Sequence, residues 1–246
     1  MKRENGPPMT LMTPSQRFRE VLLLWTLAFL PGQGGGITPL ILPGGLLTRA
    51  LAQAVFAVLV VHLLDVQGEA NLLTPAGTAR RGKTLLMAGG IALVLLSLAV
   101  ALATAVNLLP GSGGDPLPES LRPGALPATH MAGVPGTGPA RVGTLALMAG
   151  SLVAIAYAEE LFFRAYLMIR LAQTGLQPAQ ALVISATLFA LVHQWQGPGA
   201  MLFAWISGLF LGGIWIIRPG IHHLALGHAT YNGLALLISA LGAGTL

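Results

Sequence analysis

Long apolar runs alternate with short polar or Pro/Gly-rich breaks along this chain, and this alternation sets the expected fold. We find seven apolar segments, at about 21–42, 46–64, 84–109, 142–171, 179–196, 199–217 and 222–243. About 20 helical residues cross the roughly 30 Å hydrocarbon core of a bilayer, and several segments reach that length. The pattern therefore predicts an all-α, polytopic membrane helical bundle with about seven transmembrane segments, and counts of six to eight also fit.

Two stretches depart from this regular alternation. The first segment is broken at Pro31 and the following glycines after about ten apolar residues, which favours a re-entrant or two-piece element. We expect it to be retained, because it lacks the small-residue cleavage site of a signal peptide. Residues 110–141 are rich in Pro and Gly and predict an extramembrane loop. The chain then divides into N-terminal membrane segments, 1–141, and a C-terminal helical core, 142–246, within one integrated membrane domain.

The composition narrows the class of protein. Hydrophobic residues make up 54% of the chain and charged residues only 9%. The formal charge of +5 does not predict a nucleic-acid partner, because the basic residues form no cluster with interleaved aromatics. They lie between apolar segments and give the N-terminus a cytoplasmic position by the positive-inside rule. Arg49, Arg122 and Arg141 fall on the outer side in this scheme. The chain has no cysteine, which excludes disulfides, thiol nucleophiles and cysteine-ligated metals.

Three charged residues interrupt the apolar segment at 142–171. Glu159, Glu160 and Arg164 fit a membrane helix only where they face protein or water, so they indicate a functional site. At about 100° per residue, Glu160 and Arg164 share one helix face, whereas Glu159 is turned about a quarter-circle from Glu160. We therefore expect a supporting Glu160–Arg164 ion pair and a Glu159 carboxylate that is left for chemistry. A buried ion-pair network that only holds helices together is the alternative.

Two later segments add polar side chains at helical spacing. Phe189 and His193 lie four residues apart, as do His228 and Asn232, so each pair shares a helix face. Taken alone, these side chains also fit packing or interhelical hydrogen bonds. At about 1.5 Å per residue, the three motifs lie roughly 13 to 23 Å from the expected cytoplasmic helix ends. One shared polar cavity is therefore compatible with their depths.

Together the three motifs are far more specific than any one of them. In chain order they read Glu-Glu-x-x-x-Arg, Phe-x-x-x-His and His-x-x-x-Asn, and Gly208 and Gly212 lie between the last two. This set resembles the CAAX protease and bacteriocin-processing family, also called CPBP or Abi, of intramembrane glutamic endopeptidases. The likeness spans roughly residues 145–237. It implies a CAAX-protease-like core in the C-terminal half, with Ala165 where relatives often have glycine.

The resemblance also implies a role for each site residue. Glu159 and His193 would activate a water molecule for attack on a peptide carbonyl, and His228 and Asn232 would stabilise the oxyanion. A zinc-dependent peptidase is the alternative mechanism, with Glu159, His193 and His228 as metal ligands. The chain lacks the His-Glu-x-x-His helix typical of zinc peptidases, so we favour a mechanism without metal or other cofactor.

The expected function is an intramembrane endopeptidase that hydrolyses a peptide bond in a membrane-associated peptide or protein. Processing of a C-terminal tail or a leader is favoured, and prenylated tails, bacteriocin leaders and C-terminal sorting tails all lie within the family's range. A proteolytically inactive membrane scaffold and a proton-coupled transporter stay open as alternatives, although we find no inverted repeat of the transporter type. The composition fits a multi-pass protein of a bacterial inner (plasma) membrane.

Overall fold

The computed structural model describes residues 12–29, 45–69, 81–107 and 138–242, and within these ranges every regular element is a helix. The all-α prediction is confirmed. In chain order the elements are α1 (Pro14–Phe29), α2 (Gly45–Val66), α3 (Arg81–Asn107), α4 (Gly138–Glu160), a π-helix η6 (Leu161–Leu167), α5 (Met168–Gln173), α6 (Pro178–Leu191), a 3₁₀ turn η7 (Gln194–Gln196), α7 (Pro198–Ile217) and α8 (Ile221–Gly242).

Most predicted segments correspond to one helix each, with shifted ends. The first begins earlier than expected, at Pro14, and its part beyond Phe29 lies outside the described residues. The fifth ends earlier, since α6 stops at Leu191 and a 3₁₀ turn follows. The predicted loop at 110–141 lies outside the described residues up to position 137, and its last four residues already belong to α4.

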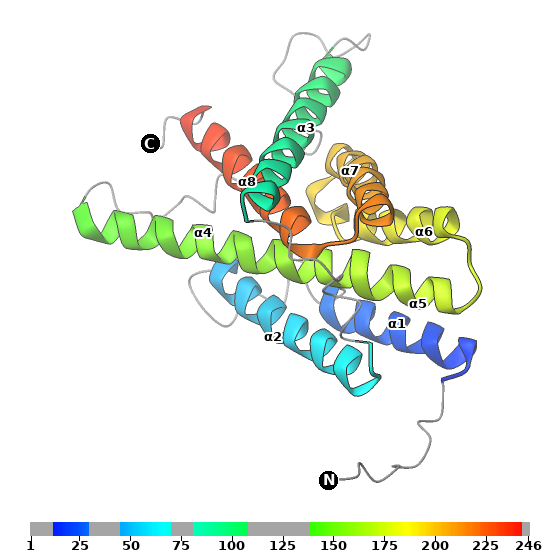
Figure 1. The fold of residues 1–246 in the computed structure, drawn as a ribbon. Coiled ribbons are helices and arrows are strands. Elements are labelled where there is room, and N and C mark those ends of the chain that lie inside the picture. The colour runs from blue at the N-terminus through cyan, green and yellow to red at the C-terminus, as the bar shows by residue number, and fades with distance from the viewer. Residues whose placement is uncertain (1–11, 30–44, 70–80, 108–137, 243–246) are drawn as a thin grey trace.

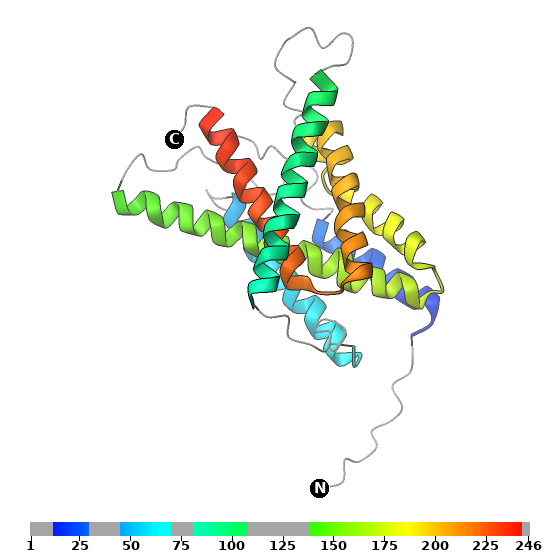
Figure 2. The same ribbon diagram turned by 45° about the horizontal axis from the view of Figure 1, so that its top comes forward.

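A long continuous rod, formed by α4, η6 and α5, is the centre of the fold. In Figure 1 α1 and α2 lie along one side of this rod, while α3, α6, α7 and α8 lie on the other, and Figure 2 shows the same division. All seven residues of η6 are buried, because α2, α6, α7 and α8 pack around it. The rod thus carries the Glu-Glu-x-x-x-Arg motif through the middle of the molecule.

Four helical stretches in the described part are long and apolar enough to cross a membrane. They are Arg49–Val66, Arg81–Ala105, Val142–Gln173 and Pro198–Ile217. The chain is therefore an integral membrane protein with several spanning helices. The third stretch is 32 residues long, or ~48 Å at 1.5 Å per residue, so it tilts or extends beyond a ~30 Å hydrocarbon core. The 14 residues of α6 cover only ~21 Å. The total of seven spans stays a prediction.

Small residues allow the helices around the rod to approach closely. A Cβ on Gly208 would lie 3.1 Å from both Cα and Cβ of Ala186, and one on Gly212 would lie 2.4 Å from Leu182 Cδ1. These two glycines therefore set the contact between α6 and α7, as expected for small-xxx-small spacing. Gly227 does the same between α3 and α8, since its Cβ would lie 3.0 Å from the backbone oxygen of Ala88.

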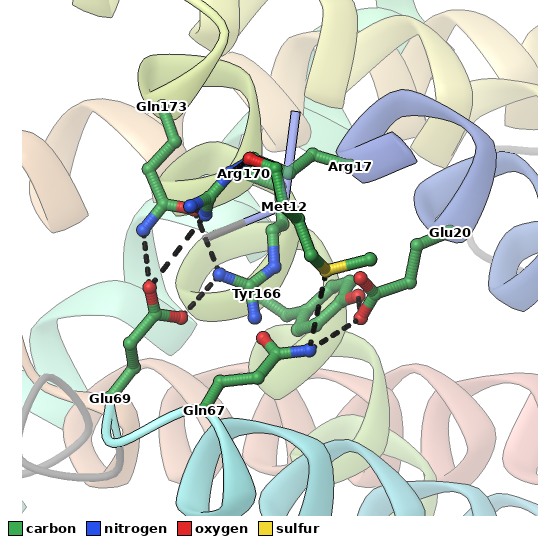
Figure 3. Close-up of polar contacts among 8 residues, drawn as sticks. All are labelled: Met12, Arg17, Glu20, Gln67, Glu69, Tyr166, Arg170 and Gln173. Carbon is green, nitrogen blue, oxygen red and sulfur yellow. Dashed lines mark hydrogen bonds and ion pairs between the residues drawn. The ribbon is translucent and has the colours of Figure 1, made fainter. Parts of the chain in front are cut away.

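A polar network joins the N-terminal helices to the C-terminal end of the rod (Figure 3). Arg170 of α5 is fully buried and binds Glu69, which follows α2, and Gln173 accepts a hydrogen bond from Arg170 at 2.8 Å. Tyr166 of η6 donates to Glu20 of α1. We call this set the Glu69 network; its members are Met12, Arg17, Glu20, Gln67, Glu69, Tyr166, Arg170 and Gln173. It fixes α1 and the end of α2 against the rod.

Candidate active site

The two glutamates and the arginine lie where α4 becomes the π-helix. Glu159 and Glu160 end α4, and Arg164 lies in the middle of η6. Their exposed fractions are 2%, 0% and 1%, so all three charges are buried inside the bundle. A π-turn widens a helix through i→i+5 hydrogen bonds and occurs often at functional sites. The sequence motif therefore marks a local change in helix geometry that the α-helical periodicity did not predict.

Glu160 and Arg164 form the expected ion pair. Glu160 Oε2 lies 3.1 Å from Arg164 Nε. The Arg164 guanidinium also lies over the ring of Phe189, 4.5 Å from its centroid. Phe189 in turn meets Phe163 edge to face. Since a buried charge is tolerated only when it is paired, Glu160 is the partner that keeps Arg164 inside the protein.

His228 of α8 connects the two carboxylates. Its Nδ1 lies 2.9 Å from Glu160 Oε1, and its Nε2 lies 3.9 Å from Glu159 Oε2. Because the paired Glu160 carboxylate can only accept, Nδ1 is the donor and carries a proton. Nε2 therefore faces Glu159 either with a lone pair, when the ring is neutral, or with a second proton. The separation from Glu159 exceeds a direct hydrogen bond, but one water molecule could contact both atoms.

His193 lies just beyond the end of α6, beside the same carboxylate. Its Nδ1 donates to the backbone oxygen of Phe189 at 2.8 Å, which leaves Nε2 as the free ring nitrogen. The imidazole interacts electrostatically with Glu159, Arg49 and His228. Its ring centroid lies 4.7 Å from that of Phe189. His193 of the second motif comes near Glu159 because α6 ends at Leu191, two residues before it.

Asn232 is placed one helical turn after His228 on α8. Its side chain is half-buried, and its carboxamide makes no hydrogen bond with any residue that the structure describes. The four-residue spacing puts it on the His228 side of the helix. Asn232 is therefore available to a ligand in the way a helix-bridging asparagine is not.

One charged neighbour of Glu159 was not recognised from the sequence. The Nη2 atom of Arg49, in α2, lies 3.5 Å from Glu159 Oε1. The sequence analysis assigned Arg49 to the outer side of the membrane from its position at a segment end, and no motif linked it to Glu159. Its guanidinium carbon also lies 5.9 Å from the ring centroid of Trp195, two residues after His193. We call Arg49, Glu159, Glu160, Arg164, His193 and His228 the Glu159 cluster.

The fit of a metal to this cluster can be judged from its side chains. The zinc alternative requires Glu159, His193 and His228 to converge on one point. Within the described ranges, no group of three or more His, Asp or Glu side chains is arranged to hold a metal ion. The present arrangement therefore does not fit a three-ligand zinc centre, and we derive no catalytic step through a metal.

A second group of polar side chains lies apart from the Glu159 cluster. His62 and Asp65 of α2 line an apolar groove of about 550 Å³ between α2, α4 and α8, together with Tyr157 and His222. The Tyr157 hydroxyl and His222 Nδ1 are 3.1 Å apart. None of the Glu159 cluster lines this groove, so we do not count it as part of the site.

The C-terminal core is similar in sequence to one known protein family. Residues 141–234 match the model of the family described as Type II CAAX prenyl endopeptidase Rce1-like. The core is Rce1-like. This match contains all six predicted site residues and confirms the resemblance to the CAAX protease family. Among curated proteins and among solved structures, no significant match is found.

The Rce1-like match covers less than half of the chain and supports a membrane endopeptidase at the level of the family. The matched segment begins at the start of the rod and ends within α8. It does not include Arg49 or the N-terminal members of the Glu69 network. The cluster around Glu159 is therefore built partly from residues outside the part that the family describes.

Proposed function

We propose that this protein is an intramembrane endopeptidase of the glutamic type, in which Glu159 and His193 activate water and His228 and Asn232 stabilise the oxyanion. The observation that supports the proposal is that the two adjacent carboxylates differ in how closely they are bound. Glu160 is held by Arg164 and His228 at 3.1 and 2.9 Å, whereas the contacts of Glu159 with Arg49 and His228 are 3.5 and 3.9 Å. Glu159 is buried but loosely held, as a general base needs to be.

The proposed reaction uses these groups in order. A water molecule beside Glu159 gives up a proton as its oxygen bonds to the peptide carbonyl carbon. The free Nε2 of His193 can accept a hydrogen bond from the same water and orient it. Negative charge develops on the former carbonyl oxygen, where Asn232 donates, and His228 donates from Nε2 when its ring carries both protons. The proton held by Glu159 then passes to the leaving nitrogen as the carbon–nitrogen bond breaks.

The proposed substrate is a membrane-associated peptide or protein whose C-terminal tail or leader is removed. A buried site in a bundle of apolar helices favours a chain that is itself at the membrane. The proposed orientation, with a cytoplasmic N-terminus in a bacterial inner membrane, rests on the distribution of Lys and Arg. Residues 1–141 and 142–246 serve in this scheme as supporting segments and catalytic core of one membrane domain.

The proposal is tested by comparing membrane proteomes from cells that express the wild-type protein or Glu159→Gln. Terminal peptides should reveal at least one membrane protein whose N- or C-terminus is shortened only with the wild type. The purified wild type in liposomes should then cut a peptide that spans the new terminus, and Glu159→Gln should not. Identical termini in both cell types, with no cleavage of membrane peptides by the purified protein, would favour the inactive scaffold. Substrate movement across sealed liposomes without cleavage would favour the transporter.

A further inference from the structure

Helix α2, which lies outside the family-matched core, supplies an arginine that contacts Glu159. Glu159 is 2% exposed, and the nearest cation to it is Arg49 of α2, at 3.5 Å. Arg164, the other arginine of the cluster, forms its ion pair with Glu160. A buried carboxylate needs a compensating charge to stay ionised. Arg164 also interacts electrostatically with Glu159, but among the described residues Arg49 is the arginine that contacts the Glu159 carboxylate directly.

Arg49 also connects Glu159 with the second motif. Its guanidinium carbon lies 5.9 Å from the ring centroid of Trp195, in the turn that follows His193. This is within the range of a cation–π contact. One side chain from α2 therefore contacts both the carboxylate and the loop that carries the histidine.

The contact with Glu159 is specific to one oxygen. Arg49 Nη2 contacts Oε1 of Glu159, while Oε2 of the same carboxylate lies 3.9 Å from His228 Nε2. An arginine on Oε1 leaves Oε2 as the oxygen that can take a proton from water. The side chain of Arg49 is 35% exposed, so its effect on stability is small, as for other partly solvated ion pairs. Its effect on the orientation of Glu159 does not need a large binding energy.

From these contacts we propose that Arg49 is a positioning residue for the endopeptidase reaction: it orients the Glu159 carboxylate and holds it in a fixed position relative to the turn that follows His193. The inference rests on the proposed function of Glu159. It adds α2, which lies outside the Rce1-like match, to the catalytic machinery.

Steady-state kinetics of Arg49→Gln, Arg49→Lys and Arg49→Ala in liposomes test the inference, with Arg19→Gln as the matched control. Arg19 is an exposed arginine of α1 outside both charged groups. We expect Arg49→Gln to lower kcat roughly ten- to hundredfold with little change in KM, because a displaced catalytic group costs up to about 10². Arg49→Lys should recover part of the loss, and Arg19→Gln should behave as wild type.

Two further readouts separate positioning from folding and from failure of the proposed function. The melting temperature of Arg49→Gln should stay near that of the wild type, and guanidinium at a non-denaturing concentration should restore part of the activity of Arg49→Ala. Normal kcat in Arg49→Gln, while Glu159→Gln is inactive, would overturn the inference alone. Normal kcat in Glu159→Gln would overturn the proposed function itself. Loss of kcat that follows a fall in melting temperature, without rescue by guanidinium, would make Arg49 a structural residue.

Discussion

Two groups of charged side chains pack against the central rod, one around Glu159 and one around Arg170, and their carboxylates are held in different ways. In the Glu69 network, Glu69 Oε1 accepts from Gln173 at 2.6 Å, and its other oxygen binds the buried Arg170. In the Glu159 cluster, the carboxylate of Glu159 has no contact shorter than 3.5 Å among the interactions described. In the first arrangement both carboxylate oxygens are bound, as in an ion pair that stabilises the fold. The second leaves a carboxylate whose oxygens can meet a substrate and water.

The comparison teaches that burial of charge alone does not identify a membrane active site. Arg170 and Arg164 are equally buried, at 0% and 1% exposure, yet each has an acidic partner that satisfies its charge. What distinguishes Glu159 is the combination of burial with contacts of 3.5 and 3.9 Å, the longer of them to the Nε2 atom of His228. The Glu160–Arg164 ion pair is a structural pair like Arg170 and Glu69, but it lies next to Glu159, the proposed catalytic carboxylate.

The largest effect is expected for Glu160→Gln, which removes the carboxylate that pairs with Arg164 inside the site. Arg164 would keep a buried charge without its partner, which costs about 3–5 kcal/mol. The hydrogen bond from His228 to residue 160 would also weaken, because a neutral carboxamide oxygen accepts less strongly than a carboxylate. Both activity and melting temperature should fall. The double variant Glu160→Gln/Arg164→Met is the control: it should recover stability without activity. A stable and active Glu160→Gln variant would show that Glu160 does not support the site, and the proposed difference between Glu160 and Glu159 would be wrong.

A smaller effect is expected for Asn232→Ala, one helical turn after His228 on α8. If the carboxamide donates to the oxyanion, kcat should fall by about 10²–10³ while KM changes little. If it only bridges helices, the change should cost roughly 1 kcal/mol of stability and leave the kcat of folded molecules intact. The kinetic constants and melting temperature of one preparation distinguish the two roles, and the latter result would leave His228 as the proposed oxyanion donor.

No effect is expected from removal of metal. The side chains of the Glu159 cluster do not converge as three zinc ligands, so prolonged chelation should leave kcat unchanged, and the purified protein should contain less than stoichiometric zinc. Elemental analysis and activity before and after chelation test this. One zinc per chain, together with activity that is lost on chelation and restored by zinc, would establish the zinc-dependent alternative.

The sequence predicted the helical fold, the Glu160–Arg164 pair and the nearness of the three motifs. These depend on helix periodicity and on apolar segments that are continuous in the chain. Arg49 could not be found in this way, because its contact with Glu159 joins residues 110 positions apart and has no fixed spacing. The π-helix was missed for a related reason: Leu161–Leu167 contains no Pro or Gly that would mark a break in the α-helical pattern.

The Glu69 network was missed as well. The basic residues between the apolar segments were interpreted together as topology signals, which is the usual meaning of basic residues at segment ends. Only the packing of α1 and α2 against the rod shows that Arg170 is buried and bound to Glu69. A basic residue at the end of a predicted span can therefore be a structural element rather than an exposed charge.

The most direct test of this account compares Glu159→Gln with Glu69→Gln, since both make the same isosteric change, the first in a buried carboxylate of the rod and the second in the carboxylate that binds Arg170 of the rod. For Glu159→Gln we expect kcat to fall by at least about 10²–10⁴, the usual contribution of a general base, with a melting temperature close to that of the wild type. For Glu69→Gln we expect a lower melting temperature and a normal kcat for the folded molecules. Wild-type turnover in Glu159→Gln, or an equal loss of kcat in both variants, would contradict the account.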